Sequence, residues 1–253
     1  MRTGRELIKA MVPKEAAVLT RSFHSAARLN LLPQWLATFQ QRHSRIRLGS
    51  EYGGWVIPAG TLNARSICYC VGCGEDISFD LALLERYSCP VYGFDPTPRA
   101  IEYVRKATSG IEGYRFFETA IWTGEGTVKF FSPVDPRHVS HSITNLARTE
   151  HYMEVPARRL SAVMHDLGHD RLTLLKLDIE GAENEVIRTI AEDGVAIDIL
   201  LVEFDELGFP SPERIARMKA SLRTLFEHGF RLFNISRNNF TFIHQGRSVP
   251  VAG

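Results

Sequence analysis

Short apolar runs alternate with helical segments along the chain from residue 66 onward. The apolar runs have the length and composition of buried strands and lie at 66–71, 91–94, 114–122, 172–177 and 197–204. Segments with helical periodicity follow them, at 77–87, 98–107, 182–193 and 213–228. Strands that alternate with helices predict a parallel sheet covered on both faces. The sequence therefore predicts a doubly wound, Rossmann-like α/β fold.

Two further strands are expected near the end of the chain, at 230–235 and 240–244. The polar turn between them is too short for a crossover helix, so the two strands should be antiparallel to each other. With them, the expected sheet is mixed at one edge and has seven strands.

The middle of the chain carries different signals. Glycines at 124–126 predict a hairpin between the strand at 114–122 and residues 127–131, and residues 132–157 have a loop-like composition.

The first 60 residues are expected to form a separate helical extension or cap, and residues 61–253 the main domain. Residues 1–47 have mostly helical spacing, and 48–60 form a connector rich in glycine and proline. Apolar side chains such as Trp35 and Phe39 predict either packing on the sheet or a homodimer through these helices.

Charge is unevenly distributed over an almost neutral chain. The net charge is +1, which gives no overall field that would attract nucleic acid, although residues 1–60 hold nine basic and three acidic side chains. The preferred interpretation is that the basic segment packs on the more acidic body or is solvated. No apolar run is long enough to span a membrane, and no secretory signal is evident. Four cysteines without a disulfide-like pattern favour the reducing cytoplasm.

A glycine loop follows the first strand of the main domain, with Gly72, Cys73 and Gly74 in succession. Glycines let the backbone turn sharply and come close to a ligand. A dinucleotide site would need a third glycine where this chain has Ile77, which weakens the prediction of an NAD site. A nucleoside without a pyrophosphate has no such need.

Asp95 ends the second strand, 21 positions after Gly74, and Pro96 follows it. This is close to the spacing of a carboxylate that accepts hydrogen bonds from ribose hydroxyls. The alternative is an ordinary helix cap, which is common for an aspartate before proline. Together with the glycine loop, the spacing favours ribose binding.

Four segments of the chain resemble the FkbM-type family of class I S-adenosylmethionine-dependent methyltransferases. They are 69–80, 91–98, 174–183 and 200–204, and the run Lys-x-Asp-x-Glu-Gly-Ala-Glu that begins at Lys176 is the most specific of them. The resemblance implies the class I methyltransferase sheet and S-adenosyl-L-methionine as the cofactor. It implies an acceptor that is a small molecule or a saccharide, methylated on a hydroxyl oxygen.

The resemblance also assigns cofactor contacts to particular positions. Gly72, Cys73 and Gly74 would pass beneath the methionine part of the cofactor. Asp95 and Pro96 would hold the ribose. The adenine would lie beside Thr119 and Ala120. Many class I enzymes have an acid where this chain has Cys70, so Asp76, or alternatively Glu75, is expected to receive the cofactor's ammonium group.

Lys176, Asp178 and Glu180 alternate along the end of an apolar strand, which places them on one face if the strand continues that far. Charges on such a strand are costly unless they are paired or lie in a site. Asp178 and Glu180 are therefore candidate catalytic residues, and the alternative is a structural pair between Lys176 and an acid. Asp178 together with Glu203 and Asp205 could bind Mg²⁺, but the ligand spacing does not support a metal site.

Two other motifs contain residue types that are common in catalytic or metal sites. His141, in the long loop before residue 172, is a candidate general base, although a single loop histidine is commonly just exposed. Cys70 and Cys73 have the spacing of a redox or zinc pair, but no further ligands complete a tetrahedral set, so packing as small apolar residues is favoured.

Three functions are compatible with these residues. The favoured one is an S-adenosylmethionine-dependent O-methyltransferase, whose cofactor brings an activated methyl group and requires no nucleophilic side chain. The second is an NAD-dependent oxidoreductase, against which Ile77 and the lack of a hydride-transfer set argue. The third is a non-catalytic module that keeps the cofactor pocket, a possibility that Cys70 leaves open.

Overall fold

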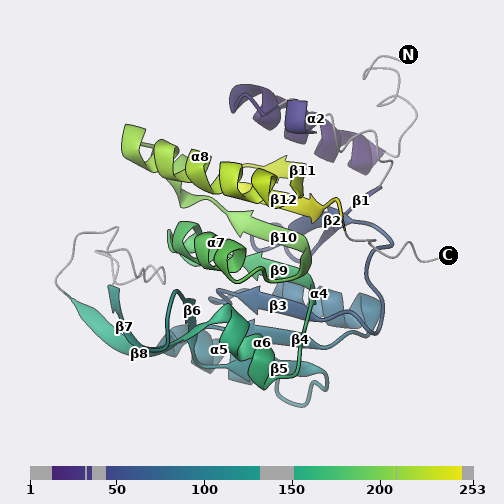
Figure 1. The fold of residues 1–253 in the computed structure, drawn as a ribbon. Coiled ribbons are helices and arrows are strands. Elements are labelled where there is room, and N and C mark those ends of the chain that lie inside the picture. Colours follow the sequence, from purple (N-terminus) through teal and green to yellow (C-terminus); the bar gives the residue numbers. More distant parts are fainter. Residues whose placement is uncertain (1–12, 32, 36–43, 132–150, 209, 247–253) are drawn as a thin grey trace.

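A seven-stranded mixed sheet lies at the centre of the protein (Figure 1). The structure is a computed structural model that describes residues 13–31, 33–35, 44–131, 151–208 and 210–246. In spatial order the strands are β11 (Phe230–Ser236), β12 (Asn239–His244), β10 (Ile197–Glu203), β9 (Leu172–Leu177), β3 (Cys68–Val71), β4 (Val91–Phe94) and β5 (Tyr114–Phe117). Strands β10, β9, β3, β4 and β5 are parallel, and β12 is antiparallel to both of its neighbours. The predicted Rossmann-like fold and its mixed edge are confirmed.

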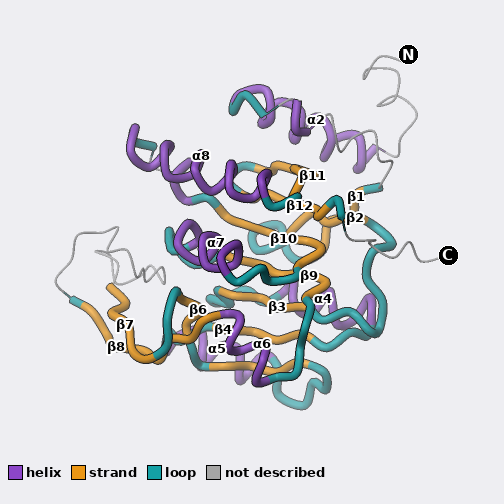
Figure 2. Tube along the Cα trace, in the orientation of Figure 1, coloured by secondary structure: helices purple, strands orange, loops and turns teal. Residues whose placement is uncertain are grey.

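Helices cover both faces of this sheet, as the ribbon and the tube show (Figures 1 and 2). On one face lie α4 (Ser78–Tyr87) and α5 (Pro98–Ala107); on the other lie α6 (Leu160–Asp166), α7 (Glu183–Glu192) and α8 (Pro212–Glu227). Successive side chains of β3 alternate between these layers. Cys68 and Cys70 pack with residues of α4, whereas Tyr69 and Val71 pack with residues of α6 and α7. Burial on both faces explains why the central strands are continuously apolar.

The strand order reverses between β3 and β9. From β3 the chain continues outward to β4 and β5, and it then returns to the other side of β3 to form β9 and β10. In open α/β sheets, ligands bind outside the carboxyl ends of the strands at such a reversal. The fold therefore places the candidate site at the carboxyl ends of β3, β4 and β9.

A small sheet beside the main one corrects two sequence predictions. It has the order β6-β8-β7 and consists of β6 (Ala120–Trp122), β8 (Tyr152–Arg159) and β7 (Gly126–Phe131). The single strand expected at 114–122 is divided between the two sheets. The expected hairpin is wrong, because β6 and β7 each pair with β8 and not with each other. The loop expected over 132–157 is also wrong at its end, where β8 begins at Tyr152; Pro156 inside β8 disfavoured a strand there.

The N-terminal part of the chain packs on the β11 edge of the main sheet. Helix α2 (Pro13–Arg28) lies against β11, and the buried Ser22 Oγ accepts hydrogen bonds from Trp35 Nε1 at 2.7 Å and from the Ile235 N–H at 2.9 Å. A hairpin of β1 (Arg45–Leu48) and β2 (Trp55–Pro58) follows. The expectation of helix up to residue 47 and of a plain connector over 48–60 is therefore wrong at these two strands.

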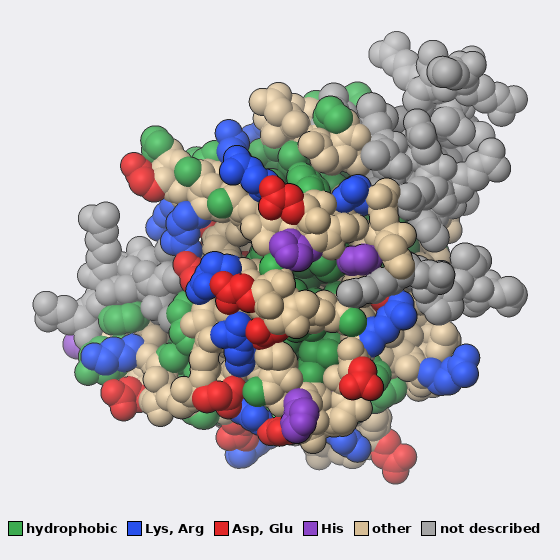
Figure 3. All heavy atoms as spheres, viewed as in Figure 1, with side chains coloured by type: hydrophobic (Ala, Val, Ile, Leu, Met, Phe, Trp, Pro, Cys, Tyr) green, Lys and Arg blue, Asp and Glu red, His purple; other side chains and the backbone are tan. Residues whose placement is uncertain are grey.

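The helices and the charged side chains of the surface bear on binding to membranes or nucleic acid. None of the helices in the described ranges has the length and apolar character needed to cross a membrane. On the face seen in Figure 3, basic and acidic side chains are interspersed and form no patch of a single sign.

Candidate functional site

The tips of β3, β4 and β9 are joined by backbone hydrogen bonds. The Gly72 N–H donates to the carbonyl oxygen of Phe94 at 2.9 Å, and the Asp178 N–H donates to that of Val71 at 3.1 Å. Gly72 has φ +83°, and a β-carbon at this position would lie 1.7 Å from the carbonyl oxygen of Asp178. Only glycine fits there, so the close approach of the two strand tips is built into the sequence.

Asp95 anchors the glycine loop from the tip of β4. One carboxylate oxygen accepts the N–H groups of Cys73 and Gly74, both at 3.0 Å. The other accepts the N–H of Thr97 at 2.9 Å and its hydroxyl at 2.6 Å. These four donors occupy the acceptor capacity of the carboxylate. Asp95 therefore shapes the loop, and its expected contact with a ribose stays a prediction.

A cavity of about 400 Å³ opens above these strand tips. Of the residues expected to contact the cofactor, all but Thr119 line it: Gly72, Cys73, Gly74, Asp76, Asp95, Pro96 and Ala120. Thr119 Oγ1 instead donates to the carbonyl oxygen of Pro156 at 3.1 Å. The candidate catalytic residues Asp178 and Glu180 also line the cavity, and His141 lies outside the described residues.

The carboxylate of Asp76 connects the turn of the β1–β2 hairpin to the start of α4 by hydrogen bonds. It accepts hydrogen bonds from Ser50 Oγ at 2.6 Å, from the Gly53 N–H at 3.2 Å and from the Ser78 N–H at 2.9 Å. Burial alone would raise the pKa of Asp76, but the hydrogen bonds from Ser50 and Ser78 outweigh it and hold the pKa below its ordinary value. The turn thereby becomes one wall of the cavity. The contact of Asp76 with a cofactor ammonium stays a prediction.

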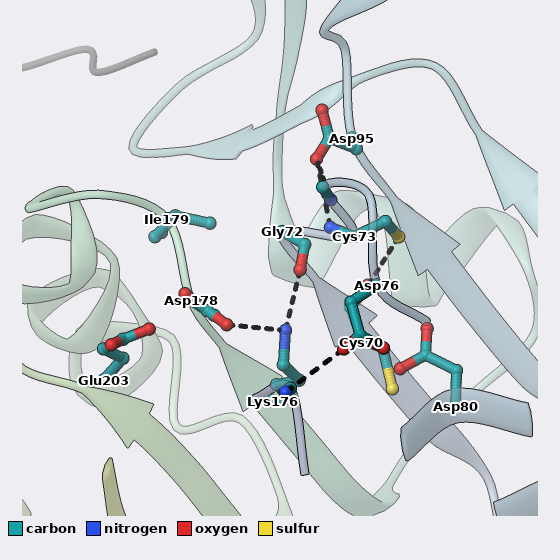
Figure 4. Close-up of polar contacts among 12 residues, drawn as sticks. Cys70, Gly72, Cys73, Asp76, Asp80, Asp95, Lys176, Asp178, Ile179 and Glu203 are labelled. Carbon is teal, nitrogen blue, oxygen red and sulfur yellow. Dashed lines mark hydrogen bonds and ion pairs between the residues drawn. The ribbon is translucent and has the colours of Figure 1, made fainter. Parts of the chain in front are cut away.

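Lys176 is buried beneath the cavity, only 4% exposed. Figure 4 shows its side chain reaching between Gly72 and Asp178. Its Nζ donates to the carbonyl oxygen of Gly72 at 2.7 Å and forms an ion pair with Asp178 Oδ2 at 3.0 Å. Burial lowers the pKa of Lys176, but the carboxylates of Asp178 and Asp80 outweigh it, so the net shift is upward and Lys176 stays charged.

The expected alternation of Lys176, Asp178 and Glu180 along one strand is not seen. Strand β9 ends at Leu177, and Glu180 adopts a left-handed backbone conformation with φ +55° in the turn before α7. Asp178 still lies beside Lys176 because the ion pair holds it, as the structural alternative foresaw. Its side chain remains 29% exposed, so it is both anchored and accessible.

Three acids meet at the carboxyl ends of β9 and β10. Burial raises the pKa of Asp178, but Lys176 and a hydrogen bond with Glu203 outweigh it, so the pKa is lowered and Asp178 is ionised. Burial, followed by the charge of Asp178, raises the pKa of Glu203 to about 10. Burial and the charges of Glu180 and Asp178 raise the pKa of Asp205 to about 8. At neutral pH, Glu203 is therefore protonated and donates to Asp178, while Asn238 Nδ2 donates to Glu203 Oε1.

A second cavity, of about 440 Å³, adjoins the first. Both are lined by Tyr52, Gly53, Asp178 and Glu180. Tyr52 is 91% exposed and stands at this shared boundary. The second cavity continues to Glu203 and Asp205 and to the turn between β11 and β12, which reaches this edge because β12 pairs Asn239 with Glu203.

Several contributors to these cavities were not identified from the sequence. Phe130 and Ile121 line the first cavity from the small sheet, and Thr97 and Ser50 hold the two aspartates. Thr97 could have been found, because an aspartate commonly bonds its own chain two residues on. Phe130 and Ser50 carry no local signal, since their partners lie far away in sequence.

The cysteines are arranged as buried apolar residues. All four are buried and free, and the sulfurs of Cys68 and Cys89 lie 3.8 Å apart. Burial raises the pKa of Cys70 and Cys73 well above the ordinary value, which disfavours a reactive thiolate. Within the described residues, no group of three or more His, Cys, Asp or Glu side chains is arranged to hold a metal ion.

Comparisons with known proteins identify one family and several solved structures of low sequence identity. The model of the methyltransferase FkbM domain matches residues 58–232. No curated protein matches the sequence significantly. Similar solved structures include the Methanococcus jannaschii fibrillarin pre-rRNA processing protein, with 10% identity, TM-score 0.44 and coverage of 73% of this chain and 69% of that one. Another is Aeropyrum pernix fibrillarin in complex with natively bound S-adenosyl-L-methionine, with 11% identity, TM-score 0.43 and coverage of 74% and 68%.

Proposed function

The chain belongs to the FkbM methyltransferase family, and on this premise we propose that it transfers the methyl group of S-adenosylmethionine to a hydroxyl group of a small molecule, sugar or glycan. The observation that carries the proposal is the shared boundary of the two cavities, where Asp178 faces both. One cavity would hold the methyl donor and the other the acceptor.

The residues of the first cavity fit the cofactor. A volume of about 400 Å³ suits a ligand of nucleoside and amino-acid size. Gly72 and Gly74 leave the backbone open to close approach, and Ile121 and Phe130 offer apolar surface to a purine. The ionised Asp178 offers a negative charge to a sulfonium. When bound, S-adenosylmethionine supplies an activated methyl group, so no nucleophilic side chain is needed.

Asp178 is proposed to accept the proton of the acceptor hydroxyl. The ion pair with Lys176 and the hydrogen bond from Glu203 keep its carboxylate ionised and oriented. A carboxylate within hydrogen-bond reach of a hydroxyl can take its proton as the oxygen forms its new bond. Alignment of the acceptor and exclusion of water would provide the rest of the acceleration.

Glu180 lies at the same boundary and is a second candidate beside Asp178. The general-base role of His141, the cytoplasmic location and a homodimer through the N-terminal helices stay predictions.

Calorimetry with S-adenosylmethionine, S-adenosylhomocysteine and NAD tests the cofactor. We expect the two sulfur compounds to bind and NAD not to bind. The acceptor atom is then tested by incubating the protein with methyl-labelled S-adenosylmethionine and a panel of sugars, with mass spectrometry of the products. Binding of NAD alone would reject the proposed cofactor, and label on nitrogen or carbon would reject the hydroxyl acceptor.

A further inference from the structure

Three arginines from three different elements line the second cavity. Arg21 comes from α2, Arg47 from β1, and Arg237 from the turn between β11 and β12. Burial lowers the pKa of Arg47, and among the nearby charges Arg21 and Arg237 lower it further while Glu51 raises it. Arg21 and Arg237 both line this cavity and are both close enough to Arg47 to act on its charge. Positive charges gathered in this way favour an anion between them.

Two of these arginines are available to a ligand. Arg47 is committed, because its guanidinium donates to the carbonyl oxygens of Gly54, Ser50 and Glu51 at 2.7 to 2.8 Å. Within the described part of the chain, the side chains of Arg21 and Arg237 make no hydrogen bond or ion pair, and both residues are exposed. Their fork of donors matches a phosphate or carboxylate group.

The acids of the cavity do not cancel this charge at neutral pH. Glu203 is protonated because burial and the charge of Asp178 raise its pKa to about 10. Asp178 is ionised, but Lys176 pairs with it. Burial raises the pKa of Asp205 to about 8, so this acid is mostly protonated at neutral pH. The other acids that line the cavity are Glu51 and Glu180, two carboxylates against three arginines.

The remaining polar lining is neutral. Ser236, Asn238 and Asn239 follow one another around the β11–β12 turn and face the same cavity. Hydroxyl and amide groups of this kind pair with the hydroxyls of a polyol.

From this arrangement we infer that the second cavity binds an anionic polyol, whose phosphate or carboxylate group contacts Arg21 and Arg237 while one of its hydroxyls lies at Asp178. The inference rests on the proposed function, because it names the class of acceptor for the same site. A neutral sugar would bring no anionic group to the side chains of Arg21 and Arg237.

The test compares three sugars that differ in charge. Glucose 6-phosphate, glucuronate and glucose are titrated into the protein saturated with S-adenosylhomocysteine, and affinities are measured by calorimetry. We expect at least one of the two anions to bind about tenfold or more tightly than glucose, and the preference to weaken as salt is added.

Variants assign the preference to its residues. The double variant Arg21→Gln, Arg237→Gln should lose the preference for the anion. Arg223→Gln is the matched control, because Arg223 is an exposed arginine of α8 that does not line the second cavity, and it should keep the preference.

The outcomes separate this inference from the proposed function. Equal binding of the three sugars, no binding of any of them, or an unchanged preference in the double variant would overturn the inference. Failure of S-adenosylhomocysteine to bind in the first step would instead overturn the proposed function.

Discussion

The backbone at Gly72 approaches the carbonyl oxygen of Asp178 so closely that a β-carbon on residue 72 would lie 1.7 Å from that oxygen. The contact joins the tip of β3 to the tip of β9, and both residues line the cavity where the methyl donor is proposed to bind. The geometry of the site therefore requires glycine at position 72.

Replacing Gly72 by alanine should disrupt this junction. The new methyl group would clash with backbone that cannot move independently, and φ +83° adds strain of about 1–2 kcal/mol. We expect a clear fall in melting temperature together with loss of S-adenosylhomocysteine binding. Gly74→Ala is the control, because Gly74 also has positive φ but has no atom within 4 Å of an added β-carbon. Equal melting temperatures for the two variants would show that the clash is relieved.

Replacing Asp178 by asparagine should slow methyl transfer while leaving in place the binding of S-adenosylhomocysteine, which carries no sulfonium charge. The amide cannot accept the hydroxyl proton, and loss of a positioned general base lowers rates by about 10²- to 10⁴-fold. Steady-state rates with a methylated acceptor and calorimetry with S-adenosylhomocysteine separate the two effects. Asp170→Asn, in the loop before β9, changes an exposed carboxylate away from the cavities and should leave the rate unaltered. A wild-type rate in Asp178→Asn would remove this residue from the proton transfer.

The free energy of unfolding should fall as the pH rises, because Glu203 holds a proton in the folded protein. The pKa of Glu203 is about 10 in the folded protein against an ordinary 4.5, so the folded state holds a proton that the unfolded chain releases. This contribution to stability is complete below the unfolded pKa and is lost progressively as the pH rises toward the folded pKa.

Glu203→Gln removes that dependence because the amide is neutral at every pH. The melting temperature of the variant minus that of the wild type should therefore increase as the pH is raised from about 5 to about 9. Glu227→Gln, at an exposed position on α8, serves as the control and should show no such trend. A constant difference between Glu203→Gln and the wild type across this range would mean that Glu203 is ionised in the folded protein.

Asp95→Ala should weaken cofactor binding by about tenfold or more, because the N–H groups of Cys73 and Gly74 lose their shared acceptor and the loop loses its shape. Thr97→Val removes only the hydroxyl donor to the same carboxylate and should have a smaller effect. Calorimetry with S-adenosylhomocysteine measures both. Unchanged affinity in Asp95→Ala would mean that cofactor binding depends neither on the hydrogen bonds of Asp95 to the loop nor on a ribose contact with it.

The main sheet was predictable because its signals are local. Residues 172–177 are continuously apolar since both faces of β9 are covered, and helical periodicity follows in α7. The mixed edge followed from the short turn between β11 and β12, which leaves no room for a crossover helix.

The small sheet was not predictable because its pairing is non-local. Glycines at 124 and 126 favour a hairpin between neighbouring segments, but β6 and β7 both pair with β8, which begins at Tyr152. Phe130 reaches the first cavity through this arrangement, so a lining residue was missed together with its strand.

At the site, the sequence located the strand tips but not their internal bonding. Gly72, Asp95 and Asp178, each placed by the sequence at the end of a strand, all line one cavity. Spacing could not show that Asp95 is already held by four donors, or that Asp76 is bonded to Ser50 from a hairpin 26 positions earlier.

The bonding of Asp76 bears on the order in which two ligands can arrive. Because this carboxylate fixes Ser50 and Gly53 through the protein's own hydrogen bonds, the wall between the proposed donor and acceptor cavities is preorganised, and neither ligand would have to order it on binding. Under the proposed function, the methyl donor and the acceptor could then bind in either order.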